Sequence, residues 1–227
     1  ELIPSQDGQA ISAVKMARQV RLKGDEYYPL LNVKGLNCWP SHPNYDQLND
    51  EDAMALRTGN INLESSWSEW KDRGIPLTLE VGKDFDAIVL GASLGSMPEL
   101  CPELIRQKKN WQQMVDSVKT VQTQAWQLWF NQTPEQLDVE QGKLLSTYVE
   151  PVDTFAEMNQ LISREQWPDG SNVGYIAYLC GVFEDAADIP PYTDHQFPAR
   201  EWQRVRNGLA VYLEKHMKHL LPGCYDV

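Results

Sequence analysis

One serine between two glycines, in the run Gly91-Ala92-Ser93-Leu94-Gly95, has a type and spacing that could do chemistry. The pattern matches the Gly-x-Ser-x-Gly elbow of serine hydrolases, in which a strand leads into a sharp turn and a helix follows directly. Residues 85–90 just before it are nearly all apolar, as expected of a strand that is buried on both faces. The helix is expected several residues late, because Pro98 favours a helix start near its own position.

A serine hydrolase would also need an acid and a histidine, in the chain order Ser, Asp or Glu, His. Asp188 with His195 or His216 would satisfy that order. Nothing in the sequence marks these residues as a pair, and no His-Gly oxyanion motif precedes the serine. A serine hydrolase is therefore an alternative interpretation, and Ser93 is not expected to be a nucleophile.

Two histidines, His216 and His219, have the helical spacing at which both could bind one metal ion. Met217 and Leu220 define the apolar stripe of the same segment, which leaves His219 on a solvated or flanking face. A histidine in the last turn of a helix commonly interacts with the helix dipole. No metal site is expected, and the acidic run Asp50-Glu51-Asp52 is interpreted as a charged first helical turn.

The composition argues against several classes of partner. Lys and Arg number 20 against 32 Asp and Glu, and a net charge of −12 repels nucleic acid and anionic membranes. The one basic cluster, Arg106-Gln107-Lys108-Lys109, is short and is typical of a solvated helix end. No apolar run approaches the roughly 20 residues of a membrane span. Cys38, Cys101, Cys180 and Cys224 lack C-x-x-C spacing, which favours free thiols and a cytoplasmic location.

The pattern of elements predicts an α+β fold with α/β-like features, in which helices flank a mixed β-sheet. Region 1–97 is expected to contain two hairpins around an irregular insertion at 24–74. The first hairpin joins residues 1–5 and 10–22 across Asp7-Gly8, and the second joins residues 75–81 to the strand ending at Leu90. Asn49 and Asp50 are expected to cap a helix over residues 50–56.

Region 98–227 is expected to be a second domain with helices and strands. Helices are predicted over 98–108 and 110–117, and strands over 118–130, 143–149 and 173–183. Thr154 and Glu157 have capping-box spacing, which predicts that a helix opens at residues 153–158. The clearest helix is 201–220. Its apolar stripe comprises Trp202, Val205, Leu209, Leu213, Met217 and Leu220.

Several segments, taken in their order along the chain, resemble one group of proteins, and the resemblance spans roughly residues 9 to 220. They are Tyr28-Pro29-Leu30, Val33-Lys34-Gly35-Leu36, Cys38-Trp39-Pro40-Ser41, Leu63-Glu64-Ser65-Ser66-Trp67, residues 85–91 and 118–125, Glu150-Pro151, and Tyr175-Ile176-Ala177-Tyr178. The group consists of large bacterial flavoproteins and is similar to FAD-dependent oxidoreductases of the amine-oxidase and phytoene-desaturase type.

The resemblance implies that 1–97 is part of an FAD domain and that the segment after Pro98 is a substrate domain. It implies that Gly91, Ala92 and Ser93 face the cofactor, and that a small organic substrate loses a hydride to the flavin. No Gly-x-Gly-x-x-Gly motif occurs, so the chain is expected to be a central fragment that binds no FAD by itself. The catalytic residues are unknown.

The expected partners are the substrate, the rest of the parent chain and a second copy that pairs through exposed sheet edges. The remaining alternative is a non-catalytic domain that serves protein interaction or structure.

Overall fold

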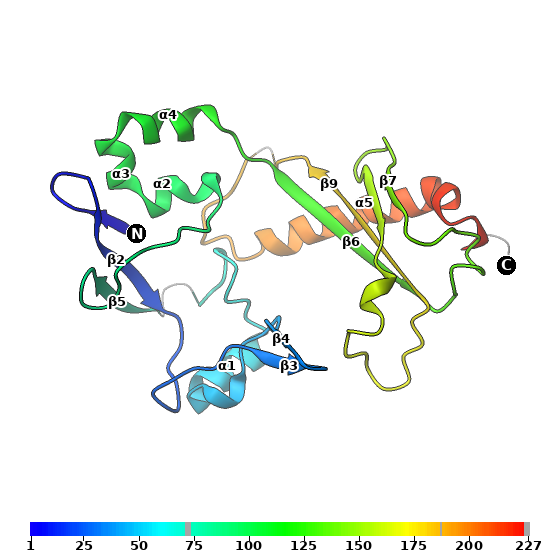
Figure 1. The fold of residues 1–227 in the computed structure, drawn as a ribbon, viewed down its shortest axis with the longest axis horizontal. Coiled ribbons are helices and arrows are strands. Elements are labelled where there is room, and N and C mark those ends of the chain that lie inside the picture. Colours follow the sequence, from blue (N-terminus) through cyan, green and yellow to red (C-terminus); the bar gives the residue numbers. More distant parts are fainter. Residues whose placement is uncertain (71–73, 187, 225–227) are drawn as a thin grey trace. The chain divides into compact units, whose positions relative to one another are not determined.

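The computed structural model describes residues 1–70, 74–186 and 188–224, and it divides into two compact units (Figure 1). Unit 1 contains residues 1–27 and 45–120, and unit 2 contains residues 28–44 and 121–227. Both units combine helices with sheets, which confirms the α+β class. The ladders between the named strands are all antiparallel, so the expected mixed sheet is not found in the part of the chain that is described.

The sheet of unit 1 has the order β1-β2-β5 and consists of β1 (Leu2–Pro4), β2 (Ile11–Arg18) and β5 (Ile75–Glu80). The first hairpin is confirmed, since β1 pairs with β2. Its turn is fixed by Asp7, whose Oδ1 accepts hydrogen bonds from Ser5 Oγ and from the Gln9 amide. The second strand of the hairpin ends at Arg18, four residues before the predicted end.

The predicted second hairpin is wrong. Strand β5 pairs with β2 over six residue pairs, and residues 85–90 form no strand. Glu80 and Asp84 turn the chain sharply, because the Glu80 amide donates to the Asp84 carboxylate and the Asp84 amide donates to the Glu80 carbonyl. In place of a paired strand, the described residues after β5 form one isolated bridge, between Val81 and Phe85. Val89, at the centre of the predicted buried strand, is 97% exposed.

The described part of unit 1 contains four α-helices: α1 (Asp50–Gly59), α2 (Met97–Leu100), α3 (Pro102–Gln107) and α4 (Lys109–Ser117). The predicted cap of α1 is confirmed, because Asn49 Oδ1 accepts a hydrogen bond of 3.1 Å from the Glu51 amide. Met97, Cys101 and Leu104 form a core with Leu2 of β1. Residues 98–120 therefore pack with the N-terminal strands, and unit 1 extends past the predicted domain boundary at 97/98. Short 3-10 helices lie at Tyr45–Gln47 and Leu94–Ser96.

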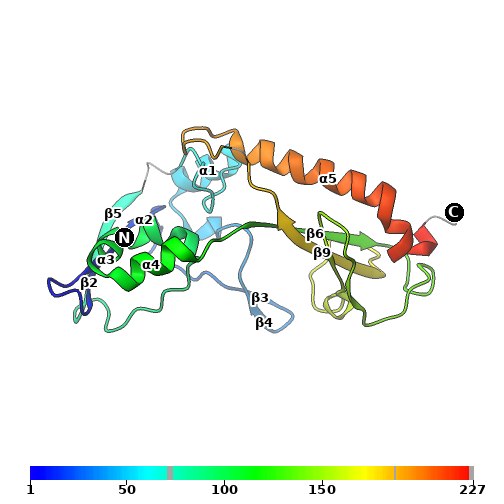
Figure 2. The same ribbon diagram turned by 90° about the horizontal axis from the view of Figure 1, so that it is seen from above.

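The sheet of unit 2 has four strands in the order β6-β9-β8-β7. They are β6 (Gln122–Phe130), β9 (Tyr175–Phe183), β8 (Thr154–Glu157) and β7 (Leu144–Ser146). The long helix α5 (Phe197–Leu220) runs along one face of β6 and β9 (Figure 2). The core between sheet and helix contains the buried side chains of Trp126, Leu137, Val152, Phe155, Tyr175, Ala177, Leu179, Tyr212, Met217 and Leu221.

The predicted helix at 153–158 is wrong, because this segment forms the inner strand β8. Thr154 and Glu157 do not form a capping box: Thr154 Oγ1 bonds to Asp153, and Glu157 accepts a hydrogen bond from the Gly142 amide. The backbone of β8 instead pairs with both β7 and β9. A tertiary pairing of this kind overrides the local helix signal.

Helix α5 confirms the predicted helix and most of its apolar stripe. Val205, Leu209, Leu213 and Leu220 pack against the core, and Met217 is part of it. Trp202 departs from the stripe and is 60% exposed, with the guanidinium of Arg206 over its ring. None of the helices in the described ranges has the length and apolarity needed to cross a bilayer.

Unit 2 also includes the small hairpin of β3 (Leu31–Val33) and β4 (Leu36–Cys38). Its two turn residues, Lys34 and Gly35, both have positive φ values, of 49° and 88°, as a type I′ turn requires. Lys34 Nζ donates to the carbonyls of Ser163 (2.9 Å) and Glu165 (2.7 Å), which ties the hairpin to the loop before β9. Further 3-10 helices are Asn159–Leu161 and Pro222–Cys224.

Candidate functional site

The predicted cofactor-binding turn lies in an irregular, exposed part of unit 1. Gly91, Ala92 and Ser93 are all exposed, and they follow a segment without regular structure. A Cβ placed on Gly91 would meet nothing within 4 Å. The turn is therefore open to solvent. It is not at the end of a buried strand.

Ser93 does not adopt the geometry of a nucleophile elbow. Its φ and ψ are −60° and 147°, which is relaxed extended backbone, and no strand precedes it. Its Oγ accepts a hydrogen bond of 3.4 Å from the Gly95 amide, so the side chain caps the 3-10 helix that follows. The residues considered as its partners, Asp188, His195 and His216, belong to unit 2. The His216 ring packs on Tyr212 with a centroid separation of 5.3 Å.

The described side chains were compared with the requirements of a metal site and of a reactive thiolate. Within the ranges that the structure covers, no cluster of three or more His, Cys, Asp or Glu side chains is suited to a metal ion. All four cysteines are free thiols. Burial raises the pKa of the Cys101 and Cys224 thiols above its ordinary value, which suppresses thiolate formation. These two cysteines are packing residues.

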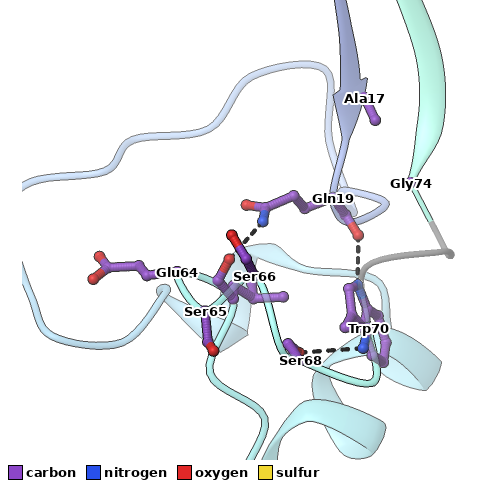
Figure 3. A pocket seen from close by; sticks show the side chains of 9 residues that line it. Ala17, Gln19, Glu64, Ser65, Ser66, Ser68, Trp70 and Gly74 are labelled. Carbon is purple, nitrogen blue, oxygen red and sulfur yellow. Dashed lines mark hydrogen bonds between the residues drawn. The ribbon is translucent and has the colours of Figure 1, made fainter. Parts of the chain in front are cut away.

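A polar cavity of about 310 Å³ lies in unit 1 where β2 ends (Figure 3). Its lining consists of Ala17, Gln19, Leu63, Glu64, Ser65, Ser66, Ser68, Trp70 and Gly74. Gln19 and Trp70 fix its walls: Gln19 Nε2 donates to the Leu63 carbonyl, and Trp70 Nε1 donates to the Gln19 carbonyl, each at 2.7 Å. No local pattern in the sequence predicts this cavity, although the resemblance includes residues 63–67.

The hydroxyl groups of this cavity are used mainly to organise its own loop. Ser65 Oγ accepts from the Trp67 amide and Ser68 Oγ accepts from the Trp70 amide, each at 3.2 Å. Their O–H protons are left to donate to a small polar group. Among the lining residues that the structure describes there is no histidine to serve as a general base, so these residues can bind a group but show no pair for nucleophilic catalysis.

A second hollow of about 230 Å³ shares Gln19 and Trp70 with the first and contains Arg21 and Asp52. Asp52 accepts hydrogen bonds from the Arg21 amide and guanidinium, with a closest side-chain distance of 2.7 Å. This carboxylate raises the pKa of Arg21 above its ordinary value. Arg21 therefore anchors α1 to the chain after β2.

The sheet of unit 2 has a face that α5 does not cover, which we term the open face. Successive side chains along a strand point to opposite faces, so the residue next to each core residue in the sequence lies on the open face. Its members are Thr123, Ala125, Gln127 and Trp129 of β6, Ile176, Tyr178, Cys180 and Val182 of β9, and Thr154 and Ala156 of β8. None of these side chains is charged, and the β6 members are exposed.

One end of the open face is covered by the loop before β9. The Trp167 ring packs edge-on against Trp129, at a centroid distance of 5.2 Å, and Asn159 accepts a hydrogen bond from the Ile176 amide. Toward the other end Val182 is 55% exposed. The open face therefore combines a rigid backbone with neutral, partly aromatic side chains, which suit an uncharged organic molecule better than a phosphate or a metal ion.

No family model matches the chain, and neither curated proteins nor solved structures show a significant similarity to it.

Proposed function

We propose that this chain is part of an FAD-dependent oxidoreductase of the amine-oxidase type, and that the open face of unit 2 contacts its small organic substrate. One observation carries the proposal: α5 covers one face of the unit 2 sheet, whereas the β6 side chains on the other face are exposed. The α5 face holds the core, whereas the open face presents Thr123, Gln127 and Trp129 from a fixed strand. Side chains on regular strands hold a bound molecule more accurately than side chains on loops.

The chemistry that this surface supports is binding and orientation. Neutral side chains such as Tyr178 and Gln127 can donate and accept hydrogen bonds, while Trp129 and Val182 exclude water from an apolar substrate. The bound flavin would supply the hydride-accepting chemistry. The described residues offer no acid–base pair for the reaction on this face, so substrate position is the contribution we assign to it.

Features of unit 1 support the same proposal. Ile88, Val89 and Leu90 have the composition of a buried strand, yet Val89 and Leu90 are exposed in this chain. In a complete FAD domain such a run would be covered by neighbouring strands. Gly91, Ala92 and Ser93 would then hold the cofactor by close backbone approach, as the resemblance implies. The free thiols fit the cytoplasmic location that we propose for the protein.

The proposal is tested by measuring bound flavin. The protein expressed from its uninterrupted natural gene should be yellow and should contain about one FAD per chain, as judged by visible absorption and by mass spectrometry of the released cofactor. The 227-residue chain should be colourless, since its sequence has no phosphate-cradling glycine motif. A natural protein that is purified without flavin and takes up none on incubation with FAD would refute the proposal.

A further inference from the structure

Strand β6 is an unusual edge. It lies at the end of the unit 2 sheet, has nine residues, and contains no charged residue, proline or glycine. Natural edge strands are normally protected from pairing with other chains by shortness, by charge, by proline or by a bulge. The opposite edge strand, β7, follows this rule, because it has only three residues. The β6 edge has none of these safeguards.

A hollow of about 520 Å³ lies beside this edge. It is lined by Gln127, Leu128, Trp129, Phe130, Leu213, Met217 and Cys224. The described lining residues are mostly apolar and carry no charge, in a chain whose net charge is −12. Two copies of such an acidic chain repel each other over most of their surfaces, so they can meet most easily where charge is absent.

We propose that β6 pairs in antiparallel orientation with β6 of a second copy of the chain, so that the sheets of the two copies of unit 2 form one continuous sheet. Pairing all nine residues places Trp126 opposite Trp126 of the second copy, and Ala125 opposite Gln127 of the second copy. In this register no like charges oppose each other. The contact is isologous, as expected of a two-fold dimer. The inference does not depend on the proposed function.

The same register allows the backbone groups at the β6 edge to form hydrogen bonds and keeps corresponding faces of the two sheets on the same side. Backbone groups that point away from β9 alternate along β6, and the register sets outward-pointing residues of one copy opposite outward-pointing residues of the other. It also keeps even-numbered residues on one face, so both copies of α5 lie on the same face of the joined sheet. The hollow that includes Leu128 and Leu213 then lies at the junction of the two copies.

Charge substitutions test both the edge and the register. Ala125→Lys with Gln127→Lys opposes lysine to lysine twice across the dimer, whereas Ala125→Lys with Gln127→Glu opposes lysine to glutamate at the same places. We expect the wild-type chain to be a dimer by size-exclusion chromatography with light scattering. The Lys/Lys variant should raise the dissociation constant at least about tenfold, and the Lys/Glu variant should restore dimers. Leu144→Lys, on the opposite edge, is the control and should remain dimeric.

Three results would overturn the inference. The first is a wild-type chain that stays monomeric at the highest concentration at which it remains in solution. This measurement does not depend on whether any variant folds. The second is a Lys/Lys variant that dimerises as well as wild type. The third is a Lys/Glu variant that has a wild-type circular dichroism spectrum but remains as monomeric as the Lys/Lys variant, which would exclude the register.

Discussion

The two units bury their apolar side chains in different ways. Unit 2 has one cluster of ten buried residues between its sheet and α5, counted over the described ranges. Unit 1 has two separate clusters of four, one beneath α2 and α3 and one around α1. It also leaves Val89 exposed in a run with the composition of a buried strand. This difference indicates that unit 2 is organised around one core, whereas unit 1 is organised around two smaller ones.

Two glycines, one in each unit, differ sharply in the space around them. Gly181 of β9 lies so close to the loop after β7 that an added Cβ would overlap the Pro151 carbonyl oxygen. Gly91 in unit 1 has no such neighbour. A crowded glycine permits close packing inside a core, and an open glycine leaves room for something else. We therefore expect a side chain to be tolerated at Gly91 and not at Gly181.

The largest effect is expected from Leu179→Ala in the core of unit 2. Leu179 is fully buried, so the substitution removes packed methyl groups and should lower the free energy of unfolding by about 2–5 kcal/mol. The matched control is Leu144→Ala, at a side chain that is 74% exposed, which should change it by less than about 0.5 kcal/mol. Urea unfolding followed by tryptophan fluorescence gives both values. Equal losses would show that unit 2 lacks a cohesive core.

A smaller effect is expected from Gly181→Ala. The new methyl group would overlap the Pro151 carbonyl oxygen and lie 2.9 Å from Val152 Cα, which should cost about 1–3 kcal/mol. Gly91→Ala should stay within about 1 kcal/mol of wild type, because its site is open. Scanning calorimetry compares the two variants. The contrast between the units would fail if the Gly91 variant were the more destabilised.

The start of each main helix provides the next comparison. Asn49→Ala removes the hydrogen bond to the Glu51 amide and should destabilise α1 by about 1 kcal/mol. Gln196, which precedes α5, makes no side-chain capping bond, so Gln196→Ala should leave that helix unchanged. Hydrogen exchange of the first-turn amides measures both. The capping argument would be contradicted if Gln196→Ala accelerated exchange in α5 more than Asn49→Ala accelerated exchange in α1.

The smallest effect concerns acid. Hydrogen bonds and charge from Arg200 lower the pKa of Asp194 below its ordinary value, so this pair stabilises the fold above the unfolded-state pKa of about 3.9. The contribution is lost as pH falls through the lower, folded-state pKa. Asp194→Asn should therefore lower the unfolding midpoint slightly at neutral pH and not at strongly acidic pH. A deficit that persists in strong acid would mean that the substitution acts through packing.

Local signals in the sequence predicted several elements correctly. Asn49 and Asp50 identified α1, Asp7-Gly8 identified the first hairpin, and the apolar period identified α5. Each of these depends on residues that are close together in the chain. The predictions failed where a distant partner decides: β5 pairs with β2, and β8 lies between β7 and β9. A buried strand cannot be inferred from apolar residues alone when its pairing partner is unknown.

The candidate site shows the same limit. Gly91, Ala92 and Ser93 were located by a local pattern, and whether they bind a cofactor stays a prediction. The cavity at Gln19 and Trp70 was not predicted, because it joins the end of β2 to a loop about fifty residues later in the chain. The open face could not be predicted either, since it requires the register of β6, β9 and β8.

The most direct test of the central claim compares one substitution on the open face with a matched one elsewhere. Val182→Trp places a bulky ring on the open face, and Val211→Trp places the same ring on α5; the two valines are 55% and 49% exposed. Both variants are made in the protein from the uninterrupted natural gene, and anaerobic reduction of its flavin is measured with a panel of amines and alcohols. We predict that Val182→Trp retains flavin but is reduced at least about tenfold more slowly, while Val211→Trp matches wild type. Equal reduction rates in the two flavin-containing variants would contradict the claim that the open face contacts the substrate.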